Sequence, residues 1–346
     1  MSVNTTDNRS NSRLVEVDSL RGLAALSVVL FHYTTRFAEL FGASQPPSLS
    51  FPLGSFGVNL FFIISGFVIF MTLEKTSRPM YFVVSRFSRL FHAYWVAIIV
   101  TFAITHWLGL PGKLVDMATA LANLIMIHGL FRIPHVDGVY WTLEVELLFY
   151  CGMFLLYRFN RLHLIHYALL GLLVLRVVYF VLKQTFGIEL SWTLSRIFIL
   201  NYIPWFALGI SICLATTRHG AGNWRKPAMT AGCAILTLLI VSSWFVALLG
   251  TILALAVFFA AKGRLAPLRH PILVWLGSIT YPLYLLHENI GWSLQLRLKA
   301  LGVPMDLTIL AALACSLALA TALTRCVEQP AMRWIRQTYR KRLSPA

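Results

Sequence analysis

The sequence predicts an all-α membrane protein, a polytopic transmembrane helical bundle of about ten spans with both termini in the cytoplasm. Of its 346 residues, 58% are hydrophobic and only 12% are charged, whereas soluble domains are about 45–50% apolar and about 25% charged. The mean hydropathy is +0.73, and several apolar runs approach the ~20 residues that cross a bilayer. This composition excludes a soluble enzyme, a disordered chain and a nucleic-acid-binding module.

The positions of the apolar runs divide the chain into three parts. A cytoplasmic N-terminal tail (1–18) precedes a ten-span membrane domain (19–325), and a basic cytoplasmic C-terminal tail (326–346) follows it. The spans are expected at residues 19–38, 56–73, 90–108, 140–157, 164–182, 196–215, 227–243, 245–261, 271–292 and 306–325. The segment 114–131 is short and carries Asp116, Asn123 and His128, so its arrangement is open between re-entrant, surface-lying and spanning.

The distribution of charge favours ten crossings and explains the formal charge of +16. With ten spans, most of the 29 lysine and arginine residues fall on the side of the two termini, as the positive-inside rule requires of cytoplasmic loops. Counting 114–131 as a span would move Arg158 and Arg161 to the outside. The excess of basic residues therefore indicates orientation in a membrane, and no nucleic-acid partner is expected.

No metal site is expected. The five cysteines lie in or at the end of apolar runs, and no CxxC spacing occurs. An odd number of cysteines without that spacing supports neither a zinc site nor a disulfide framework.

Arg21 and His32 are the most informative pair of polar residues in the first span, because charged side chains in spans are costly and usually functional. Eleven positions correspond to about three turns plus 20°, so the two residues share a helix face and are ~16 Å apart along the axis. The ordinary alternatives, a snorkelling arginine and a hydrogen-bonded core histidine, stay open on this evidence.

Three further polar side chains are expected at the depth of His32. Glu146 lies ~9 Å below the outer surface in the fourth span, and His287 lies ~24 Å from the inner face in the ninth. Tyr284 is one turn before His287. These four residues, from three separate spans, therefore reach the outer third of the bilayer together.

A basic cluster is expected at the cytoplasmic side. Arg86 and Arg89 are one helical turn apart and so are neighbours on one face. Together with Arg21 they would suit bidentate contacts with phosphate groups. Ordinary positive-inside anchoring explains the same residues equally well.

These residues lie in motifs that resemble the acyltransferase-3 family of membrane acyltransferases, over roughly residues 15 to 335. The matching runs are D-S-L-R-G-L-A-A-L-S-V-V-L-F-H from Asp18 to His32, F-F-I-I-S-G-F with Ser65 and Gly66, R-F-S-R from Arg86 to Arg89, W-T-L-E-V-E-L-L-F-Y from Trp141 to Tyr150, Y-P-L-Y-L-L-H from Tyr281 to His287, and E-Q-P from Glu328. The resemblance implies a multi-pass enzyme of the bacterial inner membrane that moves an acyl group, commonly acetyl, from acyl-CoA to a hydroxyl group, usually of a surface or secreted glycan.

The resemblance also implies roles for particular residues. His32 would be the catalytic histidine and Arg21 its motif partner, while Arg86 and Arg89 would belong to the motif linked to acyl-CoA. The motif or structural positions are Asp18, Ser65, Gly66, Trp141, Tyr150 and Glu328. The fourth-span motif departs from the family at Thr142, where serine is common, and at Leu147 and Leu148, where Glu-Gln is common.

A mechanism follows as a hypothesis from thioester chemistry. A histidine near pKa 6.5 can take the proton of a sugar hydroxyl as that hydroxyl attacks, so His32 would be the general base. Glu146 or His287 would orient it or adjust its charge, and Tyr284 would donate to the developing oxyanion. No tightly bound cofactor is expected. The expected partners are acyl-CoA, with acetyl-CoA favoured, a glycan or lipid-linked sugar acceptor and membrane lipids, and a homo-oligomer is left open.

Two alternatives come from other functional classes. Intramembrane histidine, glutamate and arginine also occur in a transporter of a lipid-linked sugar or anionic solute. Against a transporter, the sequence has no evident internal repeat with paired broken helices. The other alternative is a non-catalytic membrane subunit of a glycan-assembly complex.

Overall fold

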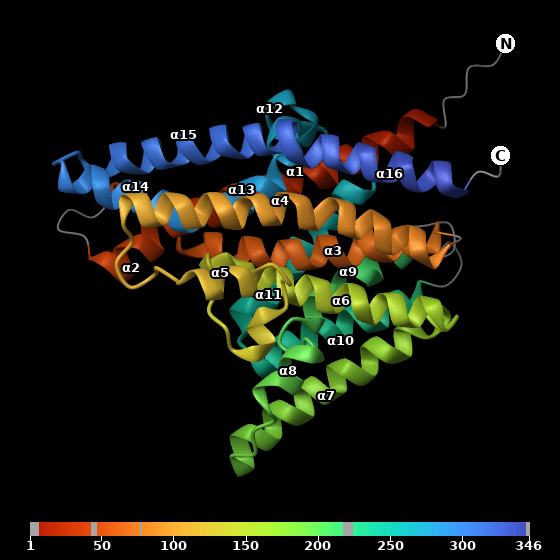
Figure 1. The fold of residues 1–346 in the computed structure, drawn as a ribbon. Coiled ribbons are helices and arrows are strands. Elements are labelled where there is room, and N and C mark those ends of the chain that lie inside the picture. The colour runs from red at the N-terminus through yellow and green to blue at the C-terminus, as the bar shows by residue number, and fades with distance from the viewer. Residues whose placement is uncertain (1–6, 43–46, 77, 217–223, 344–346) are drawn as a thin grey trace. The chain divides into compact units, whose positions relative to one another are not determined.

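A computed structural model describes residues 7–42, 47–76, 78–216 and 224–343, with side chains described between residues 15 and 339 of these ranges. Every regular element in the described ranges is a helix (Figure 1). The all-α class predicted from the sequence is confirmed.

Sixteen α-helices and two π-helical turns make up most of the described chain. The turns are His32–Arg36, between α1 and α2, and Thr324–Glu328, between α15 and α16. The helices are α1 (Asp7–Phe31), α2 (Phe37–Phe41), α3 (Gly57–Glu74), α4 (Pro79–Leu108), α5 (Met117–Asn123), α6 (Trp141–Arg158), α7 (Ile165–Phe186), α8 (Trp192–Ile197), α9 (Ile203–Thr216), α10 (Arg225–Val241), α11 (Trp244–Ala261), α12 (Pro271–Ser278), α13 (Thr280–Leu286), α14 (Glu288–Ala300), α15 (Met305–Leu323) and α16 (Gln329–Leu343).

The helices group into two compact units. The first unit contains the described residues up to Arg21, together with Val58–Pro79 and Val145–Val274. The second unit contains Gly22–Gly57, Met80–Glu144 and the described residues from Trp275 onward. The chain therefore passes several times between two groups of helices within the predicted membrane domain (19–325).

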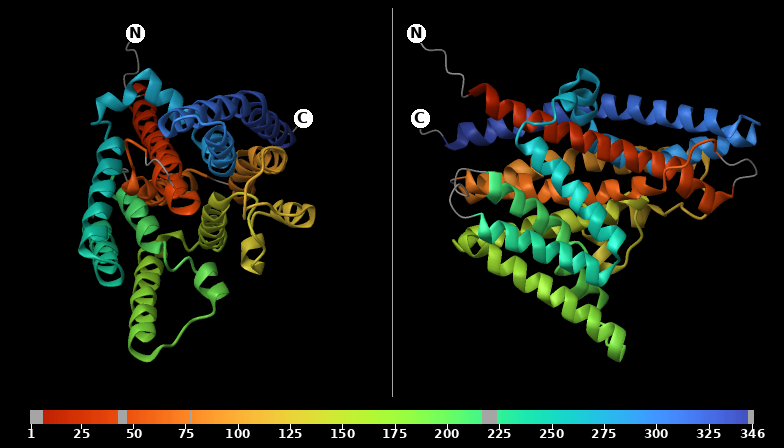
Figure 2. Two further views of the ribbon diagram at one scale, coloured as in Figure 1. Left: turned by 90° about the vertical axis from the view of Figure 1, so that its left-hand side faces the viewer. Right: turned by 180° about the vertical axis from the view of Figure 1, so that it is seen from behind.

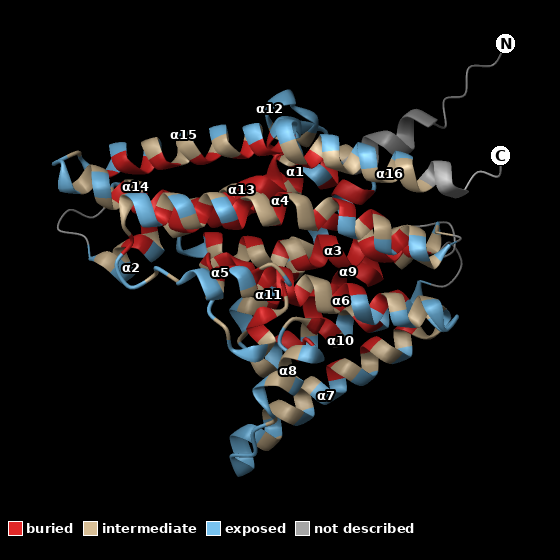
Figure 3. Cartoon of the chain, viewed as in Figure 1, coloured by how far each residue is buried: buried red, intermediate tan, exposed pale blue. Residues whose placement is uncertain are grey.

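Six helical stretches of the described residues are long and apolar enough to cross a membrane: Pro52–Glu74, Pro79–Leu108, Gly138–Arg158, Leu162–Phe186, Trp244–Ala261 and Met305–Tyr339. Several of them carry apolar side chains on their outer surface. Only 17% of the apolar stretch in Leu162–Phe186 is buried, and Figure 3 shows α7 with few buried residues. Exposed apolar surface of this extent is typical of a helix that contacts lipid, so the chain is a multi-pass membrane protein.

Some predicted spans correspond to single helices of the structure, and others are divided among several helices. The segment 114–131 holds α5, a helix of seven residues, which is ~10 Å long and too short to cross a bilayer. The predicted span 271–292 is interrupted twice, because α12, α13 and α14 share it. Ten crossings and cytoplasmic termini therefore stay predictions.

Two glycines bring α3 and α9 into close contact in the first unit. A Cβ atom at Gly209 would lie 1.9 Å from the backbone oxygen of Ile63, and one at Gly66 would lie 2.4 Å from that of Phe206. Small residues at helix crossings allow this approach in membrane proteins. The predicted structural role of Gly66 is consistent with this packing. Helix α9 also packs against α7, α10 and α11.

In the second unit, α15 packs along both α13 and α14. Both views of Figure 2 show the blue α15 beside the lighter blue α14. The connection between these two helices is short, from Leu301 to Pro304, so they run antiparallel. The break between α13 and α14 therefore packs against α15, which is continuous from Met305 to Leu323.

We expect Gly209→Ala to lower the free energy of unfolding by about 1–3 kcal/mol, because the new methyl group meets backbone atoms of α3 that cannot move aside. The measurement is thermal or denaturant unfolding of purified protein in detergent. Gly171→Ala on α7 is the matched control, since a Cβ there meets nothing within 4 Å and alanine favours the helix. Equal stability of the two variants would contradict the close α3–α9 contact.

Candidate active site

Two histidines of the second unit lie where helices are interrupted. His32 is the first residue of the π-helical turn that follows α1, and His287 lies between α13 and α14. Interruptions of this kind free backbone groups for other hydrogen bonds and are frequent at functional sites. They bring together two residues that are 255 positions apart in the sequence.

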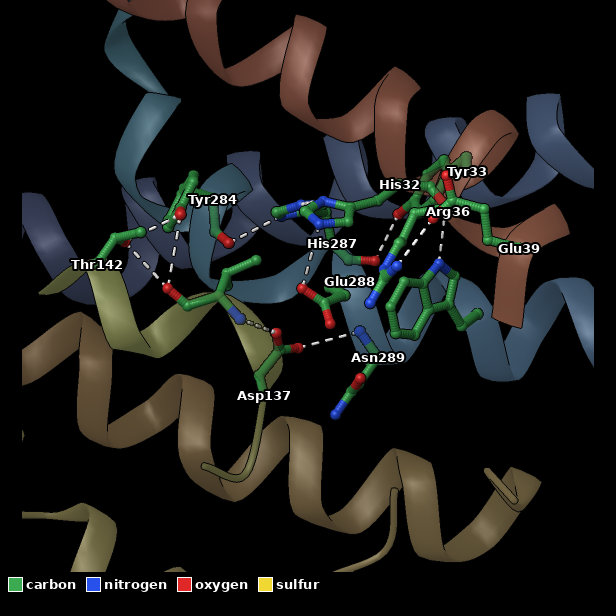
Figure 4. A network of polar contacts seen from close by, with 12 residues as sticks. His32, Tyr33, Arg36, Glu39, Asp137, Thr142, Tyr284, His287, Glu288 and Asn289 are labelled. Atoms are coloured by element: carbon green, nitrogen blue, oxygen red, sulfur yellow. Dashed lines mark hydrogen bonds and ion pairs between the residues drawn. The ribbon is translucent and has the colours of Figure 1, made fainter. Parts of the chain in front are cut away.

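The two imidazole rings form a hydrogen bond whose direction is set by the backbone (Figure 4). His287 Nδ1 lies 2.8 Å from the Tyr284 carbonyl oxygen and 3.2 Å from that of Leu283. A carbonyl oxygen only accepts, so Nδ1 carries a proton, and Nε2 of the neutral ring is an acceptor. His32 Nδ1, which is 2.9 Å from His287 Nε2, is then the donor. The remaining nitrogen of His32, Nε2, has its lone pair free.

Glu288 lies next to that free nitrogen. Its Oε2 atom is 3.4 Å from His32 Nε2, close enough to stabilise the charge of His32 once the ring takes up a second proton. The backbone of Gly138 approaches the same carboxyl group so closely that a Cβ there would lie 2.2 Å from Glu288 Oε1. Any larger residue at position 138 would displace this carboxyl group.

Exposure distinguishes the two histidines. The side chain of His32 is 13% exposed, whereas His287 is completely buried. Solvent therefore contacts the side chain of His32 but not that of His287. His32 is suited to exchange protons with a substrate, and His287 is suited to hold it in one orientation and one tautomer.

Buried hydrogen bonds fix the backbone at both interruptions. The Tyr33 hydroxyl donates to the His287 carbonyl oxygen at 2.7 Å and lies 2.6 Å from Ser316 Oγ on α15. Trp292 Nε1 donates to the His32 carbonyl oxygen at 2.9 Å. The Tyr33 ring packs on Gly291, where a Cβ would lie 2.2 Å from the hydroxyl oxygen. The backbone of His32 is thus held by Trp292 of α14, and that of His287 by Tyr33, which is itself held by Ser316 of α15.

Asp137 caps the first turn of α14. Its carboxyl oxygens accept from the backbone N–H groups of Asn289 at 3.0 Å and Val139 at 3.2 Å. A carboxylate at a helix N-terminus is favoured by the exposed N–H groups there. Burial nevertheless raises the pKa of Asp137 to about 7, against these two donors, which act to lower it. Asp137 thereby ties the segment before α6 to the helix that carries Glu288.

Tyr284 contacts His287 through its backbone carbonyl oxygen. Its hydroxyl group lies 2.9 Å from Thr142 Oγ1 at the start of α6, as Figure 4 shows. The hydroxyl group is therefore engaged by Thr142 in this arrangement. Its predicted role as an oxyanion donor stays a prediction.

Glu146 belongs to the first unit, where its carboxyl group is held by two hydroxyl groups. Ser65 Oγ donates to Glu146 Oε1 at 2.6 Å, and the Tyr150 hydroxyl donates to the same oxygen atom. His287, the other group predicted to orient His32, contacts it within the second unit. The network of Glu146 instead connects the predicted motif residues Ser65 and Tyr150, on α3 and α6.

The predicted basic residues are divided between the units. Arg21 lies on α1 in the first unit and is partly exposed. Arg86 and Arg89 lie on α4 in the second unit, also partly exposed, and the Arg86 guanidinium carbon is 5.6 Å from the centre of the Phe82 ring.

Helix α4 contacts α13 directly beside Arg89. The Tyr281 hydroxyl donates to the Leu90 carbonyl oxygen at 2.8 Å. Tyr281 is the second residue of α13, and His287 directly follows its last residue. The two ends of this short helix thus connect α4, next to the arginine pair, with the imidazole pair.

The remaining predicted motif residues are dispersed. Asp18 is exposed on α1, Trp141 begins α6 in a partly exposed position, and Glu328 is buried at the end of the second π-helical turn. Near Asp18, the buried carboxyl group is that of Glu16. Its oxygens accept from Arg269 and from the backbone N–H of Leu265.

Glu288 and Asp137 were missed as site residues by sequence reasoning. Glu288 was visible as a charged residue inside a predicted span, which is a signal of function in itself. Asp137 lies in a loop, where an acidic residue is ordinary, so the sequence carried no signal for it. Its role depends on the tertiary contact with the start of α14.

A second imidazole pair lies in the segment before α6. His128 Nε2 is 2.7 Å from His135 Nδ1, and burial, together with the neighbouring ring, lowers the pKa of His128 to about 4. No group of three or more His, Cys, Asp or Glu side chains in the described ranges is arranged to hold a metal ion.

Comparison with known proteins agrees with these features. The family model described as an acyltransferase domain matches residues 14–325. The exopolysaccharide production protein ExoZ of Rhizobium meliloti (strain 1021) is 29% identical over 184 residues, which cover 49% of this chain and 55% of ExoZ. Protein 2 in the picA locus of Rhizobium radiobacter is 34% identical over 113 residues, 30% of this chain and 54% of that protein.

The chain spans about half the length of each of these two relatives. No solved structure matches it significantly. The family model, in contrast, covers both histidines, both arginines of α4 and the whole predicted membrane domain (19–325). The chain therefore belongs to the acyltransferase-3 family of membrane acyltransferases.

Proposed function

We propose that this protein is a bacterial inner-membrane O-acyltransferase that moves an acyl group, acetyl in the first instance, from acyl-CoA to a hydroxyl group of a surface or secreted glycan or of its lipid-linked precursor. The observation that carries the proposal is the oriented imidazole pair, in which His287 binds Nδ1 of the partly exposed His32 and leaves its Nε2 to act as a base. The name of ExoZ, an exopolysaccharide production protein, supports a glycan acceptor.

His32 acts as the general base of the first step. The acceptor oxygen attacks the thioester carbonyl carbon, a C–O bond forms, and the hydroxyl proton moves to His32 Nε2. The imidazolium that results keeps its Nδ1–H bond to His287 and faces the Glu288 carboxyl group at 3.4 Å. A hydrogen bond and a nearby carboxylate both favour the charged form of the ring.

The second step regenerates the enzyme. The tetrahedral intermediate collapses, the C–S bond breaks, and the thiolate of CoA leaves as the acyl ester forms. The proton held on His32 Nε2 is then returned to the thiolate, so the ring ends neutral and in its starting tautomer. No group of the protein has to change its covalent state.

Arg86 and Arg89 are proposed to bind the phosphate groups of the donor. Guanidinium groups one turn apart on α4 suit phosphate oxygens, which they contact bidentately. The seven residues of α13 correspond to ~10 Å of helix, so a donor arm lying along α13 leads from α4 toward the imidazole pair. Arg21 is also proposed to bind the acyl-CoA donor, because it lies in the motif of the first span that resembles the family.

The predicted topology belongs to the same proposal. With ten spans and both termini in the cytoplasm, the arginine pair faces the compartment that contains acyl-CoA. His32 then lies toward the outer leaflet, where glycan precursors are assembled for export. A donor arm that reaches through the bundle would acylate an outward-facing acceptor without transport of acyl-CoA.

We expect His32→Ala to reduce acyl transfer by about 10²–10⁴-fold, the usual contribution of a positioned general base, without loss of folding. The measurement is transfer of radiolabel from acetyl-CoA by protein purified in detergent, a condition in which acylation is detectable and vectorial transport is not. His106→Ala, at an exposed histidine of α4, is the matched control. Transfer by folded His32→Ala at the wild-type rate would exclude the base role.

Substitutions of His287 test the orienting bond. In His287→Gln an amide oxygen can still accept from His32 Nδ1, whereas His287→Leu leaves that donor unpaired. Losing a hydrogen bond to a charged group costs about 1.5–3 kcal/mol, so we expect transfer by the leucine variant to fall about 10–100-fold below that of the glutamine variant. Steady-state rates of the two purified variants give the ratio, and a ratio near one would refute the orienting role.

The double variant Arg86→Gln with Arg89→Gln should weaken acetyl-CoA binding at least about tenfold, because two charge-assisted hydrogen bonds are lost. The readout is the dissociation constant from isothermal titration with acetyl-CoA. Arg325→Gln removes an exposed arginine that follows α15 and serves as the control for net charge. An unchanged dissociation constant in the double variant would remove these arginines from the donor site.

A further inference from the structure

The first unit contains an apolar groove that the acyl-transfer chemistry does not use. It has a volume of about 480 Å³ and is lined by α9, α10 and α11, which pack against one another. Apart from the hydroxyl groups of Ser211 and Thr251, its lining is apolar, and none of the described residues that line it is acidic. Its volume is within the range of ligand sites, about 300–1,000 Å³.

The length of the groove matches one leaflet of a bilayer. Along α10, its lining extends from Trp224 to Ile235, eleven positions that correspond to ~16 Å of helix. The hydrocarbon core of a bilayer is about 30 Å thick, so one leaflet is about 15 Å. The groove is therefore long enough for one hydrocarbon chain of a single leaflet.

Two basic residues, Arg225 and Lys262, lie at one end of the groove. Helix α11 begins two residues after α10 ends, so the two helices run antiparallel. Trp224, directly before α10, and Phe258, near the C-terminus of α11, therefore line the same end of the groove. Lys262 Nζ lies 5.6 Å from the centre of the Phe258 ring. Arg225 lies on the edge of the groove, because Ala228 and Gly232, three and seven positions after it, line the groove and share its side of the helix.

The neighbouring lysine of α10 points elsewhere. Lys226 Nζ lies 5.9 Å from the centre of the Tyr167 ring on α7, on the side of α10 away from the groove lining. The two adjacent basic residues of α10 thus differ in their surroundings, and only Arg225 borders the groove.

We infer that this groove binds one acyl chain of an anionic phospholipid, whose headgroup phosphate lies between Arg225 and Lys262. The apolar lining would contact the lipid acyl chain, and the groove is as long as one leaflet of the bilayer. The two cations complement a negative headgroup. Trp224, which is 69% exposed, lies where tryptophan is favoured, between the apolar groove and the headgroup level. The site is separate from the imidazole pair and does not depend on the acyl-transfer proposal.

The chain offers two matched pairs of variants. Gly232 lines the groove, and a Cβ there meets nothing within 4 Å, so Gly232→Leu adds a side chain to the groove without a clash at its Cβ. Gly171→Leu, at an equally open glycine of α7, is its control. Arg225→Gln removes a cation beside the groove, and Lys226→Gln removes the adjacent cation that faces α7.

The experiment is native mass spectrometry of the full chain released from micelles that contain equal amounts of phosphatidylglycerol and phosphatidylcholine with identical acyl chains. We expect one tightly held phosphatidylglycerol per wild-type chain, which Gly232→Leu loses and Gly171→Leu keeps. We expect Arg225→Gln to reduce the preference for phosphatidylglycerol about fivefold, and Lys226→Gln to leave it unchanged. Circular dichroism and gel filtration confirm that each variant is folded.

Three results would overturn the inference. They are retention of lipid by folded Gly232→Leu as in the wild type, equal effects of Arg225→Gln and Lys226→Gln, and release of a polyprenyl phosphate instead of a phospholipid from protein purified without added lipid. The last result would assign the groove to a lipid-linked sugar carrier.

Discussion

The arrangement of the candidate active site depends on the hydrogen bonds from His287 Nδ1 to the carbonyl oxygens of Leu283 and Tyr284. Because a carbonyl oxygen cannot donate, these bonds fix one tautomer of His287, and that tautomer fixes the orientation of the His32 ring. The other nitrogen of His32, Nε2, then faces Glu288. A difference in one proton position at a buried residue thus determines which atom of an accessible residue can act as a base.

The helix interruptions that create this arrangement are stabilised by their neighbours. The carbonyl oxygens at both interruptions accept hydrogen bonds from their own backbone, that of His287 from the N–H of Gly291 and that of His32 from an N–H at the end of its π-helical turn. Buried side chains add further hydrogen bonds, which lower the cost of polar groups in an apolar environment. Tyr33 and Trp292 supply hydrogen bonds to the carbonyl oxygens of His287 and His32, and Asp137 accepts from the first turn of α14. The site is therefore held by buried side chains from several helices, which keeps its geometry fixed before any substrate binds.

The two compact units use polar residues in different ways. In the second unit, buried polar groups converge on His32 and His287. In the first unit, Glu146 is held by Ser65 and Tyr150, the crossing of α3 and α9 relies on glycine, and the groove along α10 is almost wholly apolar. This contrast agrees with the proposals that the second unit carries out proton transfer and that the first unit binds lipid.

The sequence alone determined the helical membrane class, because apolar runs that approach ~20 residues can cross a bilayer and a single such run satisfies its backbone hydrogen bonds there only as a helix. It also singled out His32, His287, Arg86 and Arg89, since polar residues in or beside apolar spans are conspicuous. Only the tertiary structure decided that His287 contacts His32, and that Glu288 and Asp137 join the site. The reason is physical: helical periodicity fixes the face and depth of a side chain, but contacts between helices depend on packing, and the breaks at His32 and His287 changed the faces that regular helices would have presented.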